Sequence, residues 1–125
     1  MEKAYRLRKS EQFRKVRDEG RSWSNRWLAL CALRNDLSYS RFGFTASRRL
    51  GSAVARNRAR RLMREAVRLR REALAPGWDL VLIARGPLRE ATFHEVDRAV
   101  EELLRRARLL LVGEGTCEQA TRDDV

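Results

Sequence analysis

The sequence has few of the residues from which metal centres and covalent active sites are built. It contains two cysteines, Cys31 and Cys117, and one histidine, His94, in 125 residues. The cysteines form no Cys-x-x-Cys pair and have no histidine at metal-ligand spacing, so we expect unpaired thiols in a reducing compartment and no metal bound by the protein. His94 is interpreted as structural or solvent-exposed rather than catalytic.

Catalytic signatures and long hydrophobic runs are also missing. The chain has no GxxxxGK(S/T) phosphate loop, no Ser/His/Asp set and no pair of carboxylates at catalytic spacing, so by itself it lacks the parts of a nuclease. The apolar runs at residues 80–84 and 109–112 are far too short to span a bilayer, and the charged N-terminus does not resemble a signal peptide. We therefore expect a cytoplasmic protein with no membrane partner.

Acidic residues are scarce relative to basic ones. The chain has 17 Asp and Glu against 28 Lys and Arg, a net charge of +11 over a length that suits one domain. This balance favours an anionic partner, nucleic acid above all. Only three of the basic residues are lysines, which leaves 25 arginines. The arginine fork suits bidentate phosphate contacts, although we attribute the larger share of the bias to a GC-rich genome.

Most of the positive charge lies in residues 47–71, which hold ten arginines and one acid, Glu65. Like charges four residues apart destabilise a helix, so we expect an anionic partner to offset this repulsion. The spacing predicts a helix from about Ala53, capped by Ser52 after a tight turn at Gly51. Its apolar stripe is Ala55, Ala59, Leu62, Met63, Ala66, Leu69 and Ala73. On a different side, the arginines form a cationic ridge: Arg56, Arg60, Arg64, Arg68 and Arg71, flanked by Arg58 and Arg61.

Upstream of this segment the sequence predicts an arm and a short helix. Residues 1–9 are basic, and we expect them to be mobile until they bind a partner. Residues 10–19 should form a helix that Ser10 caps and Gly20 ends. Phe13 on this helix either docks on the core or faces a ligand.

The remaining segments predict a sheet and one more helix. Residues 27–34 and 41–46 should pair as a β-hairpin, and the apolar residues 79–85 should form a strand in the sheet interior. A capping box at residues 92–95 begins the last helix. Residues 113–125 are polar and acidic and are expected to be a disordered tail.

The arginine segment resembles the signature of a known family. Residues 51–65, with Arg56-Asn57-Arg58 at their centre, are similar to the RNR motif of the bacterial ribonuclease P protein subunit. Supporting context stands in the right order, with residues 13–16 and 47–49 before the motif and residues 79–85 after it. The resemblance covers roughly residues 4–111 and implies a single ribonuclease P protein domain over residues 1–112.

The resemblance implies a fold that the pattern alone does not specify. It is an α/β (α+β) sandwich like the second domain of ribosomal protein S5, with a four-stranded sheet, three helices and a left-handed βαβ crossover through the arginine helix. Crossovers are right-handed by default, so this handedness comes from the resemblance and not from the residues.

The implied function is to assist a catalytic RNA. That RNA, with Mg²⁺, removes the 5′ leader of precursor tRNA, and the protein alone is expected to be inactive. The implied partners are the catalytic RNA and the single-stranded leader, with no obligate protein partner.

The resemblance divides the implied site residues into two sets. The set that docks on the catalytic RNA and helps to organise its metal-binding region is Arg56, Asn57, Arg58, Arg60, Arg61 and Arg64. The set at the leader-binding cleft is Phe13, Arg17, Trp27, Cys31, Arg48 and Arg49.

Two positions of the cleft depart from the family pattern. Arg17 stands where a second helix aromatic is common, and Cys31 stands where a strand tyrosine is common. Each lost aromatic removes about 1–3 kcal/mol of base stacking. Trp27, expected on the same strand face as Cys31, is a hypothetical replacement.

Three other functions stay open on the residues alone. A ribosomal or other structural RNA-binding protein would have a similar charge and fold without a catalytic partner. An intrinsic nuclease would need acidic metal ligands in a cleft. A helix-turn-helix DNA-binding protein is disfavoured, because the basic helix follows a strand rather than a partner helix.

Overall fold

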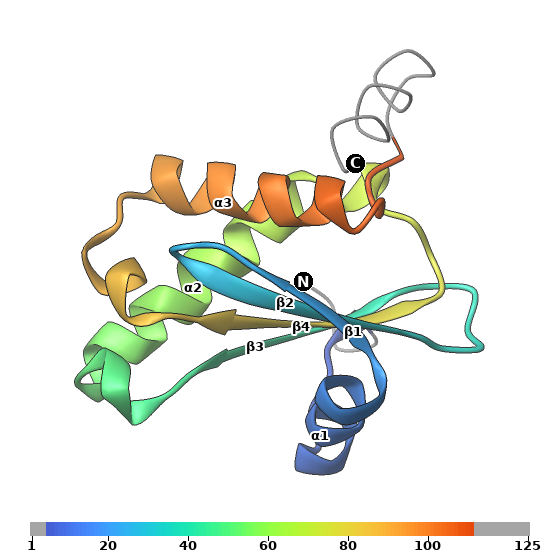
Figure 1. The fold of residues 1–125 in the computed structure, drawn as a ribbon, viewed down its shortest axis with the longest axis horizontal. Coiled ribbons are helices and arrows are strands. Elements are labelled where there is room, and N and C mark those ends of the chain that lie inside the picture. The colour runs from blue at the N-terminus through green and yellow to red at the C-terminus, as the bar shows by residue number, and fades with distance from the viewer. Residues whose placement is uncertain (1–4, 112–125) are drawn as a thin grey trace.

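The computed structural model describes residues 5–111 (Figure 1). Three α-helices and four strands follow one another as α1 (Ser10–Glu19), β1 (Arg21–Ser24), β2 (Leu28–Arg34), β3 (Arg41–Ala46), α2 (Ala53–Leu69), β4 (Trp78–Ala84) and α3 (Phe93–Arg106). Short 3-10 helices lie at Arg48–Leu50, Arg71–Ala73 and Gly86–Glu90. This α+β arrangement around one four-stranded sheet confirms the predicted fold class. The predicted tail, residues 113–125, lies outside the described residues.

The strands are arranged in the order β1-β2-β4-β3. β4 runs antiparallel to β2 and parallel to β3, and α2 makes the crossover between β3 and β4. The predicted hairpin of residues 27–34 with 41–46 is therefore wrong: β4 lies between these strands, and β2 pairs with β1 instead. A strand that is apolar on both faces is stable only in a sheet interior, and this explains the central position of β4.

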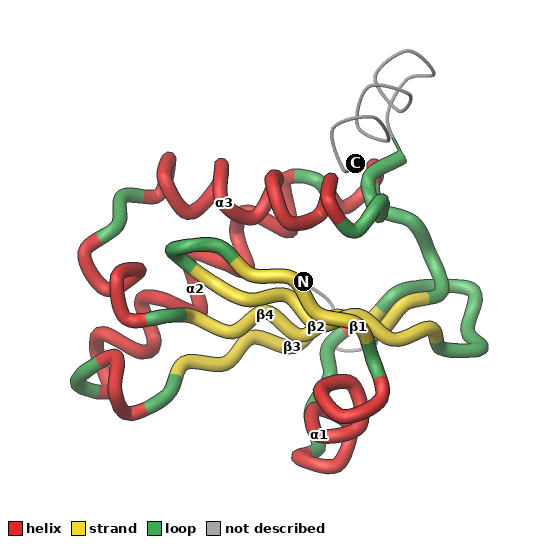
Figure 2. Tube along the Cα trace, in the orientation of Figure 1, coloured by secondary structure: helices red, strands yellow, loops and turns green. Residues whose placement is uncertain are grey.

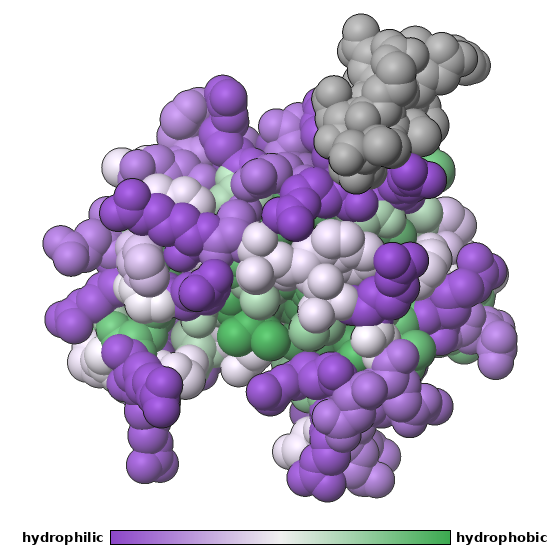
Figure 3. Space-filling model, in the orientation of Figure 1, coloured by the Kyte–Doolittle hydropathy of each residue, from purple (hydrophilic) through white to green (hydrophobic). Residues whose placement is uncertain are grey.

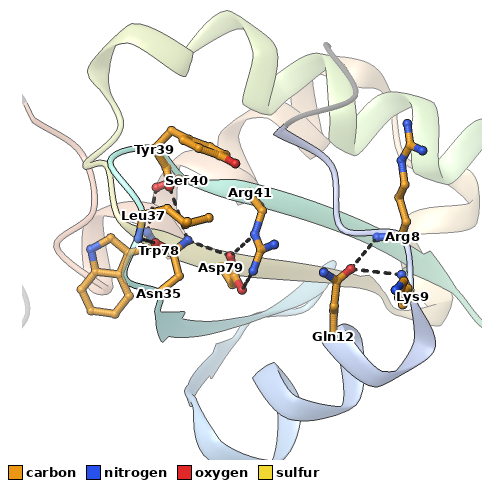
Figure 4. Close-up of polar contacts among 10 residues, drawn as sticks. All are labelled: Arg8, Lys9, Gln12, Asn35, Leu37, Tyr39, Ser40, Arg41, Trp78 and Asp79. Atoms are coloured by element: carbon orange, nitrogen blue, oxygen red, sulfur yellow. Dashed lines mark hydrogen bonds and ion pairs between the residues drawn. The ribbon is translucent and has the colours of Figure 1, made fainter.

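A buried polar network joins the start of β4 to the connection between β2 and β3 (Figure 4). The Asp79 carboxylate accepts hydrogen bonds from Arg41 Nε at 2.9 Å, Arg41 Nη2 at 2.7 Å and Asn35 Nδ2 at 2.8 Å. Ser40 Oγ accepts a hydrogen bond from Trp78 N at 3.0 Å. Since a buried charge is tolerated only when it is paired and hydrogen-bonded, this network holds β3 and β4 in register.

Helices α2 and α3 cover one face of the sheet, which we call the closed face (Figures 1 and 2). Met63 of α2, Leu103 of α3 and Leu30 of β2 belong to one cluster of 23 buried residues there. The α2 helix ends at Leu69, which is 58% exposed, so the predicted apolar stripe is wrong at Leu69. Ala73 lies beyond the helix end, in the 3-10 helix Arg71–Ala73, and still packs on the cluster. None of the described helices is long and apolar enough to cross a membrane.

Both closed-face helices begin at the caps that the sequence predicts. Ser52 Oγ accepts a hydrogen bond from Ala55 N at 3.2 Å. Thr92 Oγ1 accepts one from Glu95 N at 3.2 Å, and Glu95 Oε1 accepts one from Thr92 N at 2.9 Å. These side chains satisfy backbone donors that have no partner within the helix.

Helix α1 lies alone on the opposite face, which we call the open face (Figure 1). Ser10 does not cap it, so that prediction is wrong. The N-cap is Lys9, and Gln12 Oε1 accepts hydrogen bonds from Arg8 N at 3.0 Å and Lys9 N at 3.1 Å (Figure 4). Gly20 ends the helix as predicted. The buried cluster beneath α1 has four members: Leu7, Val16, Cys31 and Val81.

The predicted mobile arm is wrong for residues 5–9, while residues 1–4 lie outside the described part of the chain. Leu7 N donates a hydrogen bond to Phe42 O at 2.8 Å, and Arg6 forms a parallel bridge with Phe42. The Leu7 side chain is buried under α1. The arm therefore lies along the outer edge of β3.

Candidate nucleic-acid interface

A groove of about 600 Å³ opens on the open face between α1 and the sheet. Most of its lining is polar or cationic, and we call it the α1 groove: Arg8, Ser10, Phe13, Arg14, Arg17, Asp18 and Thr45. In the space-filling view, hydrophobic residues reach the surface along the sheet above α1, with hydrophilic residues around them (Figure 3). A groove that combines the Phe13 ring with arginine side chains suits a chain that has both flat bases and phosphates.

Phe13 fits into this groove because Gly43 of β3 has no side chain. A Cβ atom on Gly43 of β3 would lie 2.6 Å from two carbons of the Phe13 ring. The ring therefore lies against the bare backbone of β3, and it stays partly exposed. Phe13 thus does both things that the sequence left open, since it packs beside the small cluster and also faces the groove.

Arg17 and Cys31, the two departures from the family pattern, lie close to each other. Cys31 is 7% exposed, and burial raises the pKa of its thiol while the Arg17 charge acts against that rise. Cys31 is therefore a neutral thiol in the buried cluster beneath α1, where it offers no surface for stacking. Arg17 is exposed in the groove wall, where its guanidinium is free to meet a phosphate or a base face.

The other predicted cleft residues lie elsewhere. Arg48 and Arg49 are exposed in the 3-10 helix just after β3, past the Thr45 end of the α1 groove. Trp27 precedes β2 and packs against the closed-face cluster, under the guanidinium of Arg26 at 5.0 Å. The prediction that Trp27 shares the Cys31 face is wrong, because the alternation of faces holds only inside the strand, which begins one residue later.

The arginines of α2 differ in the contacts that they make within the protein. Arg58 donates hydrogen bonds to Arg89 O at 3.2 Å and Ala91 O at 2.8 Å, and so joins α2 to the segment before α3. Arg60 donates to Asn57 Oδ1 at 2.6 Å, which leaves most of its donors unused. Arg61 is exposed. The sequence placed Arg58 with the RNA-binding arginines, but its guanidinium is turned towards the protein.

Two other arginines of this helix each have a buried nitrogen without a hydrogen bond. The Nε atoms of Arg56 and Arg64 are buried and make no hydrogen bond within the described residues. Burial above all, and then the charges of Arg6 and Arg60, lower the pKa of Arg64. We call Arg56, Arg60, Arg61 and Arg64 together the α2 ridge.

Acidic residues neutralise only the C-terminal part of the arginine segment. Arg68 pairs with Glu65, and Arg70 pairs with Asp97 and, at 3.7 Å, with Glu101. Within residues 5–111 no carboxylate pairs with an arginine between positions 48 and 64. The α2 ridge is therefore a field of uncompensated positive charge, as an anion-binding surface requires.

The sequence did not predict six features of the groove. They are Gly43, which seats Phe13, and five lining residues, Arg8, Ser10, Arg14, Asp18 and Thr45. Arg14 could have been found, because positions 13, 14 and 17 share one side of a helix. Gly43 and Thr45 could not have been found from the sequence, because the pairing of β3 with β4 decides which face of β3 is turned towards α1. Among residues 5–111 no group of His, Cys, Asp and Glu could hold a metal ion.

Comparisons with known proteins point to one family. The family model described as Ribonuclease P matches residues 1–108. The ribonuclease P protein component of Roseiflexus castenholzii is 51% identical over 108 residues, or 86% of this chain and 88% of that one. The Clostridioides difficile protein of the same name is 43% identical over 101 residues, 80% of this chain and 89% of that one.

Solved structures of the same family share the fold. The RNase P protein of Staphylococcus aureus superposes with a TM-score of 0.80 at 29% identity, over 86% of this chain and 99% of that one. The RNase P protein of Thermotoga maritima superposes with a TM-score of 0.74 at 31% identity, over 81% of this chain and 96% of that one.

Proposed function

Since this chain belongs to the Ribonuclease P protein family, we propose that it serves two RNA molecules at once. The α2 ridge docks on the catalytic RNA of ribonuclease P. The α1 groove binds the single-stranded 5′ leader of precursor tRNA. The ribonucleoprotein then removes this leader and leaves the mature 5′ end.

The observation that carries the proposal is the separation of the two basic surfaces. The α1 groove lies on the open face, and α2 lies on the closed face of the same sheet (Figure 1). One surface can therefore be covered by the catalytic RNA while the other receives a substrate. A protein with a single basic face would make its two RNA partners compete.

The groove suits unpaired RNA better than a duplex. Bases that are not stacked in a helix can lie on the Phe13 ring, while Arg14 and Arg17 meet the phosphates on either side. Contacts of this kind do not depend on the base sequence, and leaders of different precursor tRNAs have different sequences. With a buried Cys31 where the family often has an aromatic residue, binding rests more on charge than on stacking.

In this proposal the protein takes no part in bond cleavage, in keeping with the lack of a possible metal-binding group among residues 5–111. Its contribution is electrostatic, because arginines placed between two polyanions reduce the repulsion that Mg²⁺ would otherwise have to screen. Catalysis is assigned to the RNA partner and its Mg²⁺ ions. The expected benefit of the protein is therefore largest at low Mg²⁺.

The test is 5′ processing of a precursor tRNA at low Mg²⁺ by a bacterial ribonuclease P RNA, with and without the protein. Efficient cleavage is expected only with both components, and protein alone should not cleave. Cleavage by protein alone would move catalysis to its carboxylates. No effect of the protein, together with comigration with ribosomal subunits, would favour the ribosomal alternative.

A second arm of the experiment addresses the α1 groove. Precursors with a leader of several nucleotides should bind the holoenzyme more tightly than precursors with a leader of one nucleotide. Equal affinity for the two substrates would remove the leader from the proposal and leave the docking role of α2 in place.

A further inference from the structure

The N-terminal arm and α2 form a cluster of arginines at the outer edge of β3. The bridge between Arg6 and Phe42 holds the arm against this edge. Two residues further along β3, the Phe44 ring lies on the side of α2, with the Arg64 guanidinium 5.7 Å from its centre. Arg60 lies one helical turn before Arg64 and borders the same edge.

The positive charges of this cluster have no acidic partner among the residues that the structure describes. Arg64 Nε is buried without a hydrogen bond, and among the described residues no carboxylate pairs with Arg6, Arg60 or Arg64. Burial lowers the pKa of Arg64, and the positive charges of Arg6 and Arg60 lower it further. The Phe44 ring attracts the Arg64 guanidinium, but the two neighbouring positive charges repel it until an anion arrives.

The contacts of this cluster leave hydrogen-bond donors for a ligand. The Phe44 ring lies 5.7 Å from the Arg64 guanidinium carbon, and the terminal nitrogens of the fork remain for a ligand. Arg60 spends one donor on Asn57 and keeps the others. Arg6 is exposed, and the arm brings it in from a different element of the fold. Donors that converge from two elements can surround one tetrahedral anion.

We propose that Arg6, Arg60 and Arg64 bind a single RNA phosphate over Phe44. This site makes the N-terminal arm a part of the surface that docks on the catalytic RNA, and the inference rests on the function proposed above. An acidic peptide is a poorer ligand, because the cluster continues the α2 ridge, which the same RNA would follow. The arm then joins the two RNA surfaces, since Arg6 serves the catalytic RNA and Arg8 lines the leader groove.

The test is the affinity of the full chain for a ribonuclease P RNA, without substrate, over a series of salt concentrations. The variants are Arg6→Gln, Arg64→Gln and the double variant, with Arg98→Gln on the exposed side of α3 as a control that removes the same charge. Each single variant should weaken binding several-fold more than the control does. The double variant should lower the slope of log K against log salt by about 0.7–0.9, the value for one phosphate.

A shared phosphate also makes the two substitutions non-additive. The loss in the double variant should be smaller than the product of the two single losses, because the second substitution acts on a contact already broken. Phe44→Leu should mimic Arg64→Gln in part, since it removes the ring that orients Arg64 and leaves every charge in place. Unchanged affinity in Phe44→Leu would overturn the role of the ring.

Three results would overturn the proposal while the proposed function stands. They are an Arg6→Gln variant that binds like the control, strictly additive losses, and a defect that appears only when a leader-bearing substrate is present. Failure of the unaltered protein to bind the RNA at all would instead refute the proposed function. The first binding curve therefore separates the two hypotheses.

Discussion

The two faces of the sheet are built from the same strands but differ in how completely they are covered. On the closed face, two helices bury a cluster of 23 residues among those the structure describes, whereas α1 on the open face buries a cluster of four. The open face leaves a groove of about 600 Å³ beside Phe13. Stability is concentrated on one side, and this allows the other side to remain incompletely covered.

The contrast explains why one small domain can present two RNA surfaces. Incomplete packing costs free energy, since apolar residues such as Ile83 stay partly exposed near α1. The large cluster compensates for that cost. The arginines of α2 are displayed on a helix whose opposite side is anchored in the same cluster by Met63 and Ala66.

The strongest test of this contrast uses two neighbours on β2. Leu30 points into the closed face and Cys31 into the open face. Leu30→Ala should lower the free energy of unfolding by about 2–5 kcal/mol, because it opens a cavity in the large cluster. Cys31→Ala should lower it by about 1 kcal/mol, a typical value for a small substitution. Urea unfolding measures both, and equal losses would contradict a closed face that carries most of the stability.

The α1 groove can be altered by a substitution at a residue that is not itself proposed to contact RNA. Gly43→Ala should displace the Phe13 ring and weaken leader binding by about 1–3 kcal/mol, the contribution of one stacked base. Gly86→Ala is the matched control, because a Cβ atom at Gly86 would meet nothing within 4 Å. Binding of long-leader and short-leader precursors by the holoenzyme measures the effect. A Gly43→Ala protein that discriminates between them as the original does would show that Phe13 is not the stacking surface.

Two arginines of α2, three residues apart, are expected to differ in role, one in stability and the other in RNA binding. Arg58→Ala should lower the free energy of unfolding by about 1–2 kcal/mol, because it leaves the carbonyls of Arg89 and Ala91 without their donor. Arg61→Ala should leave stability unchanged and lower the salt slope of RNA binding by about 0.7–0.9. Thermal or urea unfolding and RNA titrations distinguish the two. A reduced slope together with full stability in Arg58→Ala would reverse the assignment.

The closed face should also show a dependence on pH. The hydrogen bond from Arg70 lowers the pKa of Asp97 below its ordinary value near 3.8, although burial acts against this. Since the folded-state pKa lies below the unfolded-state value, the pair stabilises the fold above about pH 4 and loses its contribution as the pH falls through the folded-state pKa. Asp97→Asn should cost about 0.5–1 kcal/mol at pH 7, because the pair is partly solvated. Urea unfolding at pH 7 and pH 3 should show this difference shrink at the lower pH, and a constant difference would argue against the ion pair.

The smallest effect on binding is expected at Trp27. Because Trp27 packs on the closed-face cluster, Trp27→Ala should leave leader affinity unchanged and lower only stability. The same long-leader and short-leader precursors serve as the measurement. A loss of leader affinity at unchanged stability would restore Trp27 as a replacement for the missing cleft aromatics.

Local features of the fold could be predicted because their causes lie within a few residues. The caps at Ser52 and Thr92 and the end of α1 at Gly20 depend on backbone donors one turn away. The central place of β4 follows from its continuous apolar run. Phe13 and the arginines of α2 were recognisable from a family motif. The predicted cap at Ser10 was wrong, because Gln12 Oε1 accepts the hydrogen bonds from Arg8 N and Lys9 N at the start of this helix.

Features that depend on distant segments could not be predicted. The predicted partner of β2 was wrong, because β4 enters the sheet between β2 and β3. Asp79 of β4 holds it there through a hydrogen bond with Asn35, forty-four residues earlier in the chain. The mobile arm was wrong because Leu7 finds a buried place under α1. The role of Arg58 depends on carbonyls more than thirty residues away.

The sequence by itself determined where the positive charge lies, which segments form the main helices and strands, and which family the chain resembles, since these follow from residue types at short spacing. The tertiary structure alone decided which arginines are spent inside the protein and which face outward. It also decided that Phe13 lies on Gly43, that Cys31 and Trp27 belong to different faces, and that the arm with Arg6 lies along β3. The physical reason is that a guanidinium or a ring takes its role from the neighbours that packing provides, and most of those neighbours are far away along the chain.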